Sequence, residues 1–119
     1  MVNLRPHPHS SKGETTILLD LELMTGTVPL DGFAVELLFH TEAVEIADIY
    51  LTDDFADSAI DITKEFDNEA GHMLLSCASQ TPYQAGPHGL VVATICVRTK
   101  QPAATKFSVG ERTQLFIHA

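Results

Sequence analysis

Residues 33–40 read FAVELLFH, and this stretch decides the fold. Every second position carries a large apolar side chain, as listed here: Phe33, Val35, Leu37 and Phe39. The positions between them are small, charged or polar, apart from Leu38. Alternation with period two is typical of a strand that buries one face. Residues 29–32, PLDG, favour a turn. The sequence therefore predicts a half-buried strand that starts directly after a turn.

Similar alternation, or a concentration of β-branched residues, recurs on both sides of this stretch. We expect further strands at residues 2–5, 15–24, 44–49, 59–66, 72–79, 90–99, 106–109 and 113–117. Loops are expected at 52–58 and 80–89, and turns at 67–71 and Gly110. No segment has a convincing helical pattern with caps. The sequence predicts an all-β, eight- or nine-stranded sandwich over residues 1–119.

Length and charge restrict the function further. A chain of 119 residues has room for one domain. Sixteen acidic residues against seven basic ones give a net charge of −9, which repels nucleic acid and anionic membranes. No apolar run approaches the ~20 residues that span a bilayer. Residues 1–9 lack an apolar signal core, so we expect either a cytoplasmic protein or an excised mature domain.

Several motifs also occur in an informative order. They are VNLRP at 2–6, KGET at 12–15, TG at 25–26, LDGFAVELLF at 30–39, FDNEAGHMLLSCAS at 66–79, and Gly89 followed by VATICVR at 92–98. In this order, over nearly the whole chain, they resemble the motifs of a cohesin module. The resemblance implies a nine-stranded jelly-roll sandwich, related in fold to bacterial carbohydrate-binding modules. It also implies a protein that is not an enzyme and that binds a dockerin module in an extracellular or cell-surface assembly.

Strand parity predicts which side chains a partner could touch. On residues 72–79, His72, Leu74 and Ser76 face one way, and Met73, Leu75 and Cys77 the other. If the strands at 33–40, 72–79 and 90–99 share a sheet, as the resemblance implies, their outward side chains form one flat patch. We expect the partner-binding residues to be Glu36, Leu38, His40, His72, Leu74, Ser76, Thr94 and Cys96.

Two leucines in this patch occupy positions where solvent is expected, Leu38 and Leu74. Exposed apolar groups with a polar rim mark interfaces. The alternative is that they are two isolated surface leucines, which soluble proteins commonly carry. The same parity places Cys77 in the core and Cys96 on the outside, so the sequence predicts two free thiols.

A carbohydrate-binding or adhesin-type sandwich is the alternative function, and a structural spacer is the third. Sugar sites use exposed aromatic rings, but Trp is absent and only Tyr50 and Tyr83 could serve. Tyr83, in the expected loop 80–89, is the better candidate. Polysaccharide is therefore the alternative partner to a dockerin.

The sequence predicts no cofactor, no metal and no catalytic site. Most of the acidic residues lie between Glu42 and Glu69, and their spacing does not match the twelve-residue calcium loop. A solvated acidic surface that steers a basic partner is favoured there, with calcium as the alternative. His7 and His9 could chelate a transition metal, but an extended arm is favoured. Neither a nucleophile elbow nor a phosphate-binding glycine loop is present.

Overall fold

A computed structural model describes residues 2–6, 16–24, 29–52, 59–83, 90–99 and 107–117. These residues form nine strands: β1 (Val2–Pro6), β2 (Thr16–Leu23), β3 (Leu30–Phe39), β4 (Val44–Leu51), β5 (Ala59–Asp67), β6 (His72–Tyr83), β7 (Leu90–Thr99), β8 (Phe107–Val109) and β9 (Gln114–Ile117). Among them there is no helix long and apolar enough to cross a membrane.

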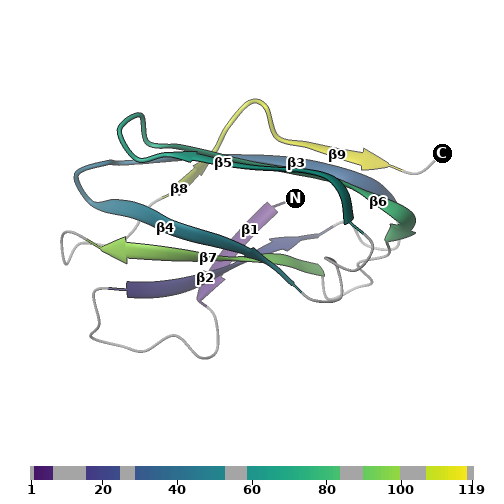
Figure 1. Cartoon of the computed structure of the whole chain (residues 1–119), viewed down its shortest axis with the longest axis horizontal. Coiled ribbons are helices and arrows are strands. Elements are labelled where there is room, and N and C mark those ends of the chain that lie inside the picture. The colour runs from purple at the N-terminus through teal and green to yellow at the C-terminus, as the bar shows by residue number, and fades with distance from the viewer. Residues whose placement is uncertain are drawn as a thin grey trace.

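The strands form two stacked antiparallel sheets (Figure 1). Sheet A has the order β1-β2-β7-β4, and sheet B has the order β5-β6-β3-β8, with β9 pairing β3 beyond β8. Strands β8 and β9 lie along the same edge of β3, opposite residues 37–39 and 30–34 respectively. The predicted nine-stranded sandwich is confirmed.

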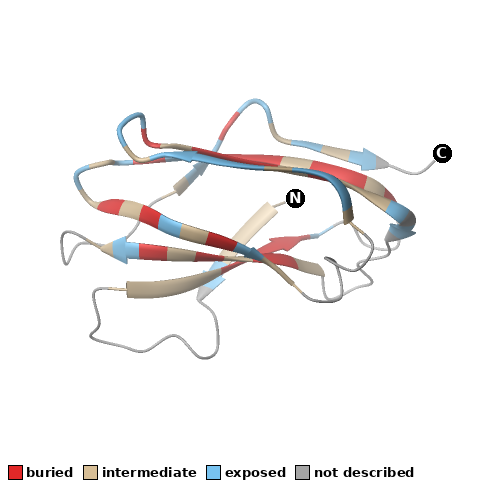
Figure 2. Cartoon of the chain, viewed as in Figure 1, coloured by how far each residue is buried: buried red, intermediate tan, exposed pale blue. Residues whose placement is uncertain are grey.

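The core lies between the sheets and follows the predicted alternation. From sheet B, β3 contributes Phe33, Val35, Leu37 and Phe39, and β6 contributes Met73, Leu75 and Cys77. From sheet A come buried residues of β2, β4 and β7: Leu21, Leu23, Val44, Ile46, Ile49, Val92, Ala93, Ile95 and Val97. Figure 2 shows buried segments alternating with more exposed ones along β4 and β7. Period-two alternation thus predicts which side of each of these strands faces inward.

Two predicted boundaries are wrong. Strand β3 begins at Leu30, within the predicted turn, and β6 continues to Tyr83, within the predicted loop. The two extensions pair with each other, Leu30 opposite Tyr83, after a register shift between Leu30 and Gly32. At Gly32 the neighbouring backbone is so close that a Cβ atom would lie 2.6 Å from the carbonyl oxygen of Cys77. Gly32 therefore lies at a β-bulge where two strands approach closely, and not in a turn.

The predicted turn between β5 and β6 is present. Gly71 has a φ of +73°, which only glycine adopts at little cost. Its N–H donates to the carbonyl oxygen of Asp67 at 2.9 Å, and its own carbonyl oxygen accepts from Phe39 N–H at 2.9 Å. The turn is thereby fixed to the end of β3.

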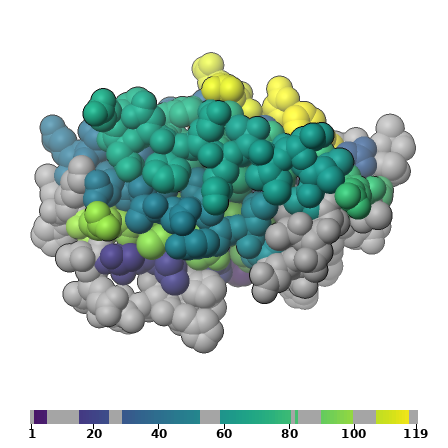
Figure 3. Space-filling view, in the orientation of Figure 1, coloured from purple at the N-terminus to yellow at the C-terminus, as the bar shows by residue number. Residues whose placement is uncertain are grey.

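One side of the sandwich is closed by side chains that reach from β5 and its turn to β4. The Asn68 amide accepts from Ile46 N–H at 2.8 Å and donates to Ile46 C=O at 2.9 Å. The Lys64 ammonium donates to the carbonyl oxygen of Ile49 at 2.9 Å. Figure 3 shows the atoms of β5 directly against those of β4 along this side. These contacts satisfy backbone groups at the edge of sheet A, which otherwise invite another strand.

Candidate partner-binding face

The outer face of sheet B is a set of cross-strand rows. Residues directly opposite each other in a sheet point to the same side. Since Phe33 and Cys77 face the core, their sequence neighbours Gly32 and Ala78 face outward. Four rows result, each read toward β5: Phe116, Gly32, Ala78 and Ile60; Gln114, Ala34, Ser76 and Thr63; Glu36, Leu74 and Glu65; Ser108, Leu38, His72 and Asp67. We call this surface the outer face of sheet B.

The apolar part of this face lies at its two ends. Leu38 is 43% exposed, and beside it lies a hollow of about 210 Å³ lined also by Phe39, His40 and Ser108. At the other end Phe116 and Ile60 are exposed and are separated by the small residues Gly32 and Ala78. The face thus offers large exposed apolar side chains at both ends.

Leu74 does not contribute an exposed side chain. It lies on the predicted face, between Glu36 and Glu65 in register, but it is only 7% exposed. The prediction that it meets solvent is wrong, because neighbouring side chains on the face cover it. Leu74 therefore supports the surface from beneath, and Leu38 is the leucine that a partner can reach.

Thr94 and Cys96 do not share this surface. They lie on β7 in sheet A, whereas Glu36, His72 and Ser76 lie in sheet B. The expectation of one patch is wrong because β7 pairs with β2 and β4 instead of β3 or β6. On the outer side of sheet A, the Thr94 hydroxyl donates a hydrogen bond of 3.0 Å to Asp20 Oδ1.

Glu36 is the most constrained residue of the face. Its side chain is on the outside of the sheet, yet the residue is only 8% exposed. Its Oε2 lies 2.8 Å from His72 Nε2 and 4.0 Å from Arg112 Nε, and its Oε1 accepts from Arg112 N–H at 3.3 Å. Gly110 packs so closely that a Cβ atom there would overlap the Glu36 carboxylate.

The backbone of Glu36 holds the same turn. Its carbonyl oxygen accepts from Gly110 N–H at 2.8 Å and from the Thr113 hydroxyl at 3.3 Å, and its N–H donates to that hydroxyl at 3.0 Å. The hydrogen bond from His72 is the main cause that lowers the pKa of Glu36; burial opposes it, and the N–H of Arg112 adds to it. The carboxylate is therefore held in its charged form at neutral pH.

The residues Gly110, Arg112 and Thr113 were not predicted as part of the face. A turn at Gly110 is readable from the sequence, but its attachment to Glu36 is not. That attachment depends on β8 and β9 pairing with the same edge of β3 on either side of Glu36, which is a long-range feature.

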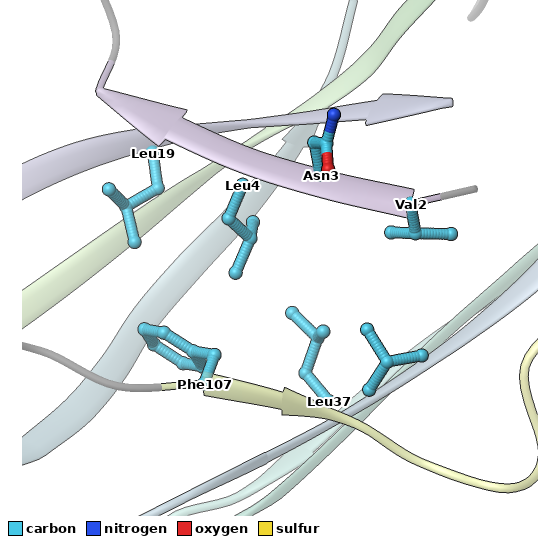
Figure 4. A pocket seen from close by; sticks show the side chains of 7 residues that line it. Val2, Asn3, Leu4, Leu19, Leu37 and Phe107 are labelled. Atoms are coloured by element: carbon cyan, nitrogen blue, oxygen red, sulfur yellow. The ribbon is translucent and has the colours of Figure 1, made fainter. Parts of the chain in front are cut away.

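A separate groove of about 400 Å³ lies at the open side of the sandwich between β1 and β8. Figure 4 shows Val2 and Leu4 of β1 directed toward Leu37 and Phe107 of sheet B. Leu19, Val109 and Asn3 complete the lining, so Asn3 is the polar side chain among the described lining residues. It lacks the convergent polar groups by which a sugar site fixes its ligand.

The remaining predicted features lie as follows. Cys77 is buried and Cys96 partly exposed, and both thiols are free, as predicted. Tyr83 ends β6, and its side chain lies outside the described residues, as do His7 and His9. Asp53, Asp54 and Asp57 also lie outside them. Within the described ranges, no group of three or more His, Cys, Asp or Glu side chains could hold a metal ion.

The solved structures most relevant here are cohesins. The third cohesin of ScaC from Acetivibrio cellulolyticus, solved with a mutated ScaB dockerin, gives a TM-score of 0.67 at 14% identity over 98% of this chain and 85% of the other. The cohesin CaCohA2 from Clostridium acetobutylicum gives 0.63 at 12% identity over 98% and 78%. The Coh-OlpC–Doc435 complex from Clostridium thermocellum gives 0.59 at 15% identity over 84% and 72%.

The chain is therefore a cohesin-like β-sandwich, and the resemblance of its motifs to a cohesin module is confirmed at the level of the fold. No model of a known protein family matches the sequence, and no curated protein matches it. The similarity lies in the arrangement of the strands, since few residues are shared.

Proposed function

We propose that this chain is a non-catalytic interaction module that binds a dockerin-type protein through the outer face of sheet B. The observation that carries the proposal is the exposure of Leu38, Ile60 and Phe116 on a face whose other side chains are small or polar, apart from the covered Leu74. Apolar groups within a polar surround are the composition of a protein interface. Structural neighbours with the same fold are solved in complex with dockerins, which supports this class of partner.

The proposed contact residues are those of the predicted patch that lie in sheet B. Leu38 and His40 border the hollow at one end, His72 lies in the same row as Leu38, and Ser76 lies in a middle row. Glu36 and Leu74 act from beneath, by supporting these side chains. We place the protein at the cell surface or outside the cell, as part of a larger or processed protein, since cohesins work there.

Binding to a small panel tests the proposal. The purified chain is immobilised and exposed to the ScaB dockerin of A. cellulolyticus, to Doc435 of C. thermocellum and to dockerins of C. acetobutylicum, each with calcium and with a chelator. Plant and bacterial polysaccharides are applied to the same surface. We expect saturable capture of at least one dockerin and no capture of a polysaccharide.

A matched variant locates the site. Leu38→Arg places a charge on the proposed face, and Tyr50→Arg places the same charge at an exposed position of sheet A. Loss of capture with the first variant alone supports the proposal. Failure of every dockerin, or capture of a polysaccharide in their place, would overturn it. Sensitivity of polysaccharide capture to Tyr83→Ala would then favour the carbohydrate-binding function.

A further inference from the structure

The turn at residues 110–113 forms a raised border of the outer face of sheet B. In Figure 1 the chain between β8 and β9 arches away from sheet A, on the side where a partner would lie. It interrupts the pairing along β3 opposite Glu36, since β8 pairs with 37–39 and β9 with 30–34. An uninterrupted edge strand would have paired more backbone groups at that position, so the arch needs other contacts to hold it.

Glu36 supplies these contacts. Its backbone binds Gly110 and Thr113, and its carboxylate accepts the N–H of Arg112. The carboxylate is itself fixed by His72 at 2.8 Å. The chain thus buries a charged side chain on the outside of a sheet, which costs free energy unless the charge is well paired. The three groups that pair it are His72 Nε2 on the face and the N–H and Nε of Arg112 in the turn.

What the turn presents is a guanidinium. The Arg112 side chain is 64% exposed, and within the described part of the chain the Glu36 carboxylate, 4.0 Å from Nε, is its partner. The contact engages one nitrogen of a group with five N–H donors. No other lysine or arginine of the described residues lies on this border. Glu111 beside Arg112 and Glu65 across the face are exposed carboxylates.

Among the described residues, the other lysine or arginine side chain near the face is turned away. Lys64, on β5, directs its ammonium to the carbonyl oxygen of Ile49 and to Asp48 at 3.7 Å, both in sheet A. Within the described ranges, Arg112 is therefore the cation on this acidic surface that would attract a partner carboxylate. A fixed cation in an otherwise acidic field discriminates between partners and sets their orientation, because like charges opposed elsewhere are costly.

We propose that Arg112 is a specificity-determining contact for a carboxylate of the partner, and that Glu36 is the positioning residue that holds the 110–113 turn for it. This inference rests on the proposed function, since it assumes a protein bound on the same face. It goes further by naming the chemical group that the partner brings to this border.

The first arm of the test uses the free chain and needs no partner. Amide hydrogen exchange of Arg112 and Gly110 is measured by NMR in the wild type, Glu36→Ala and Glu36→Gln. We expect exchange at the Arg112 amide to accelerate at least about tenfold in Glu36→Ala, because its carboxylate acceptor is removed, whereas the Gly110 amide keeps the Glu36 backbone carbonyl as acceptor and should change less. Glu36→Gln keeps an oxygen that accepts from Arg112 N–H, so it should retain the protection. Unchanged exchange in Glu36→Ala would overturn the positioning role.

The second arm measures affinity for the dockerin captured by the wild type. Arg112→Ala should weaken binding at least about tenfold, and Arg112→Glu should weaken it further because it repels the partner carboxylate. If Arg112→Glu binds as tightly as the wild type or more tightly, the partner group is not a carboxylate and the inference fails. The double variant Glu36→Ala with Arg112→Ala should lose clearly less affinity than the sum of the two single losses, because part of the effect of Glu36 is exerted through Arg112.

A further variant guards against simple loss of folding. Thr113→Val removes the hydroxyl that binds the backbone of Glu36 but leaves every charge in place. It should loosen the turn and reduce affinity as Glu36→Ala does.

Additive losses in the double variant would show that Glu36 acts independently of Arg112. If no dockerin binds the wild type, the proposed function fails and this inference with it; if one binds and the Arg112 variants bind equally well, only the inference fails.

Discussion

The outer faces of the two sheets differ in what they leave available to another molecule. On sheet A, Asp20 and Glu22 are almost fully buried, with the Thr94 hydroxyl on Asp20 and the Arg5 guanidinium 3.1 Å from Glu22. On sheet B, Leu38 and Phe116 remain exposed around small residues. Polar groups that the chain already satisfies gain little from a partner, whereas exposed apolar groups gain from being covered. Sheet A also exposes Tyr50, but there the charged groups are already paired, so the comparison favours the outer face of sheet B as the proposed binding face.

The largest expected difference is in the reactivity of the two thiols. Cys96 lies on the outer side of sheet A, and Cys77 lies in the core, where burial raises its pKa to about 12. At pH 8 a thiol reagent should modify Cys96 readily and Cys77 at least ~1,000-fold more slowly, since Cys77 reacts only after unfolding. With a reagent that releases a chromophore, absorbance follows the fast reaction of Cys96 and the slow reaction of Cys77.

This prediction also sharpens the comparison of the faces. A bulky label on Cys96 should leave dockerin capture unchanged, because Cys96 is on sheet A. The Cys96→Ser variant should lose the fast phase and keep the slow one. Two fast thiols would contradict the burial of Cys77, and loss of capture after labelling would contradict the assignment of binding to sheet B.

The next largest effect concerns the exposed leucine. Leu38→Arg should weaken dockerin binding about 100-fold, as a charge placed at a buried apolar contact does, while the melting temperature changes by only a few degrees. Tyr50→Arg is the matched control, since Tyr50 is 52% exposed on sheet A. Equal losses from both variants, measured by calorimetric titration, would remove the distinction between the faces.

A smaller effect is expected at the side where the sheets are tied together. Asn68→Ala leaves the N–H and C=O of Ile46 without their side-chain partner and should cost about 2 kcal/mol of unfolding free energy. Asn68→Asp, which keeps an acceptor for Ile46 N–H and loses the donor, should cost less. Urea denaturation gives both values. A cost below ~0.5 kcal/mol for Asn68→Ala would show that water replaces the amide there.

Much of this comparison could be predicted from sequence, because period-two alternation is a local property. This alternation correctly predicted which side of β3 and β6 faces the core, and that the two thiols are free. It could not place β7, since strand order depends on which edges meet after the chain has folded, and so Thr94 and Cys96 were assigned to the wrong surface. It also missed the covering of Leu74 and the attachment of the 110–113 turn to Glu36, both of which arise from neighbours far away in sequence.

The smallest effect is a dependence of stability on acid pH that originates in sheet B. The pKa of Glu36 in the folded chain is below its ordinary value of 4.5. The folded state therefore favours the carboxylate, and the stabilisation is complete above pH 4.5 and is lost as the pH falls through the lower folded value. Glu36→Gln removes this group, so its deficit relative to the wild type should be greatest at neutral pH and should shrink toward pH 3.

Urea midpoints between pH 7 and pH 3 measure this difference, and Gly110→Ala supplies an independent route to it. A Cβ atom at residue 110 would occupy the space of the Glu36 carboxylate and separate it from His72. Both variants should then show the same flattened pH profile, although only one removes the charge. A Gly110→Ala profile parallel to that of the wild type would mean that the carboxylate keeps its partners elsewhere. The turn would then not be what holds Glu36 in place on the binding face.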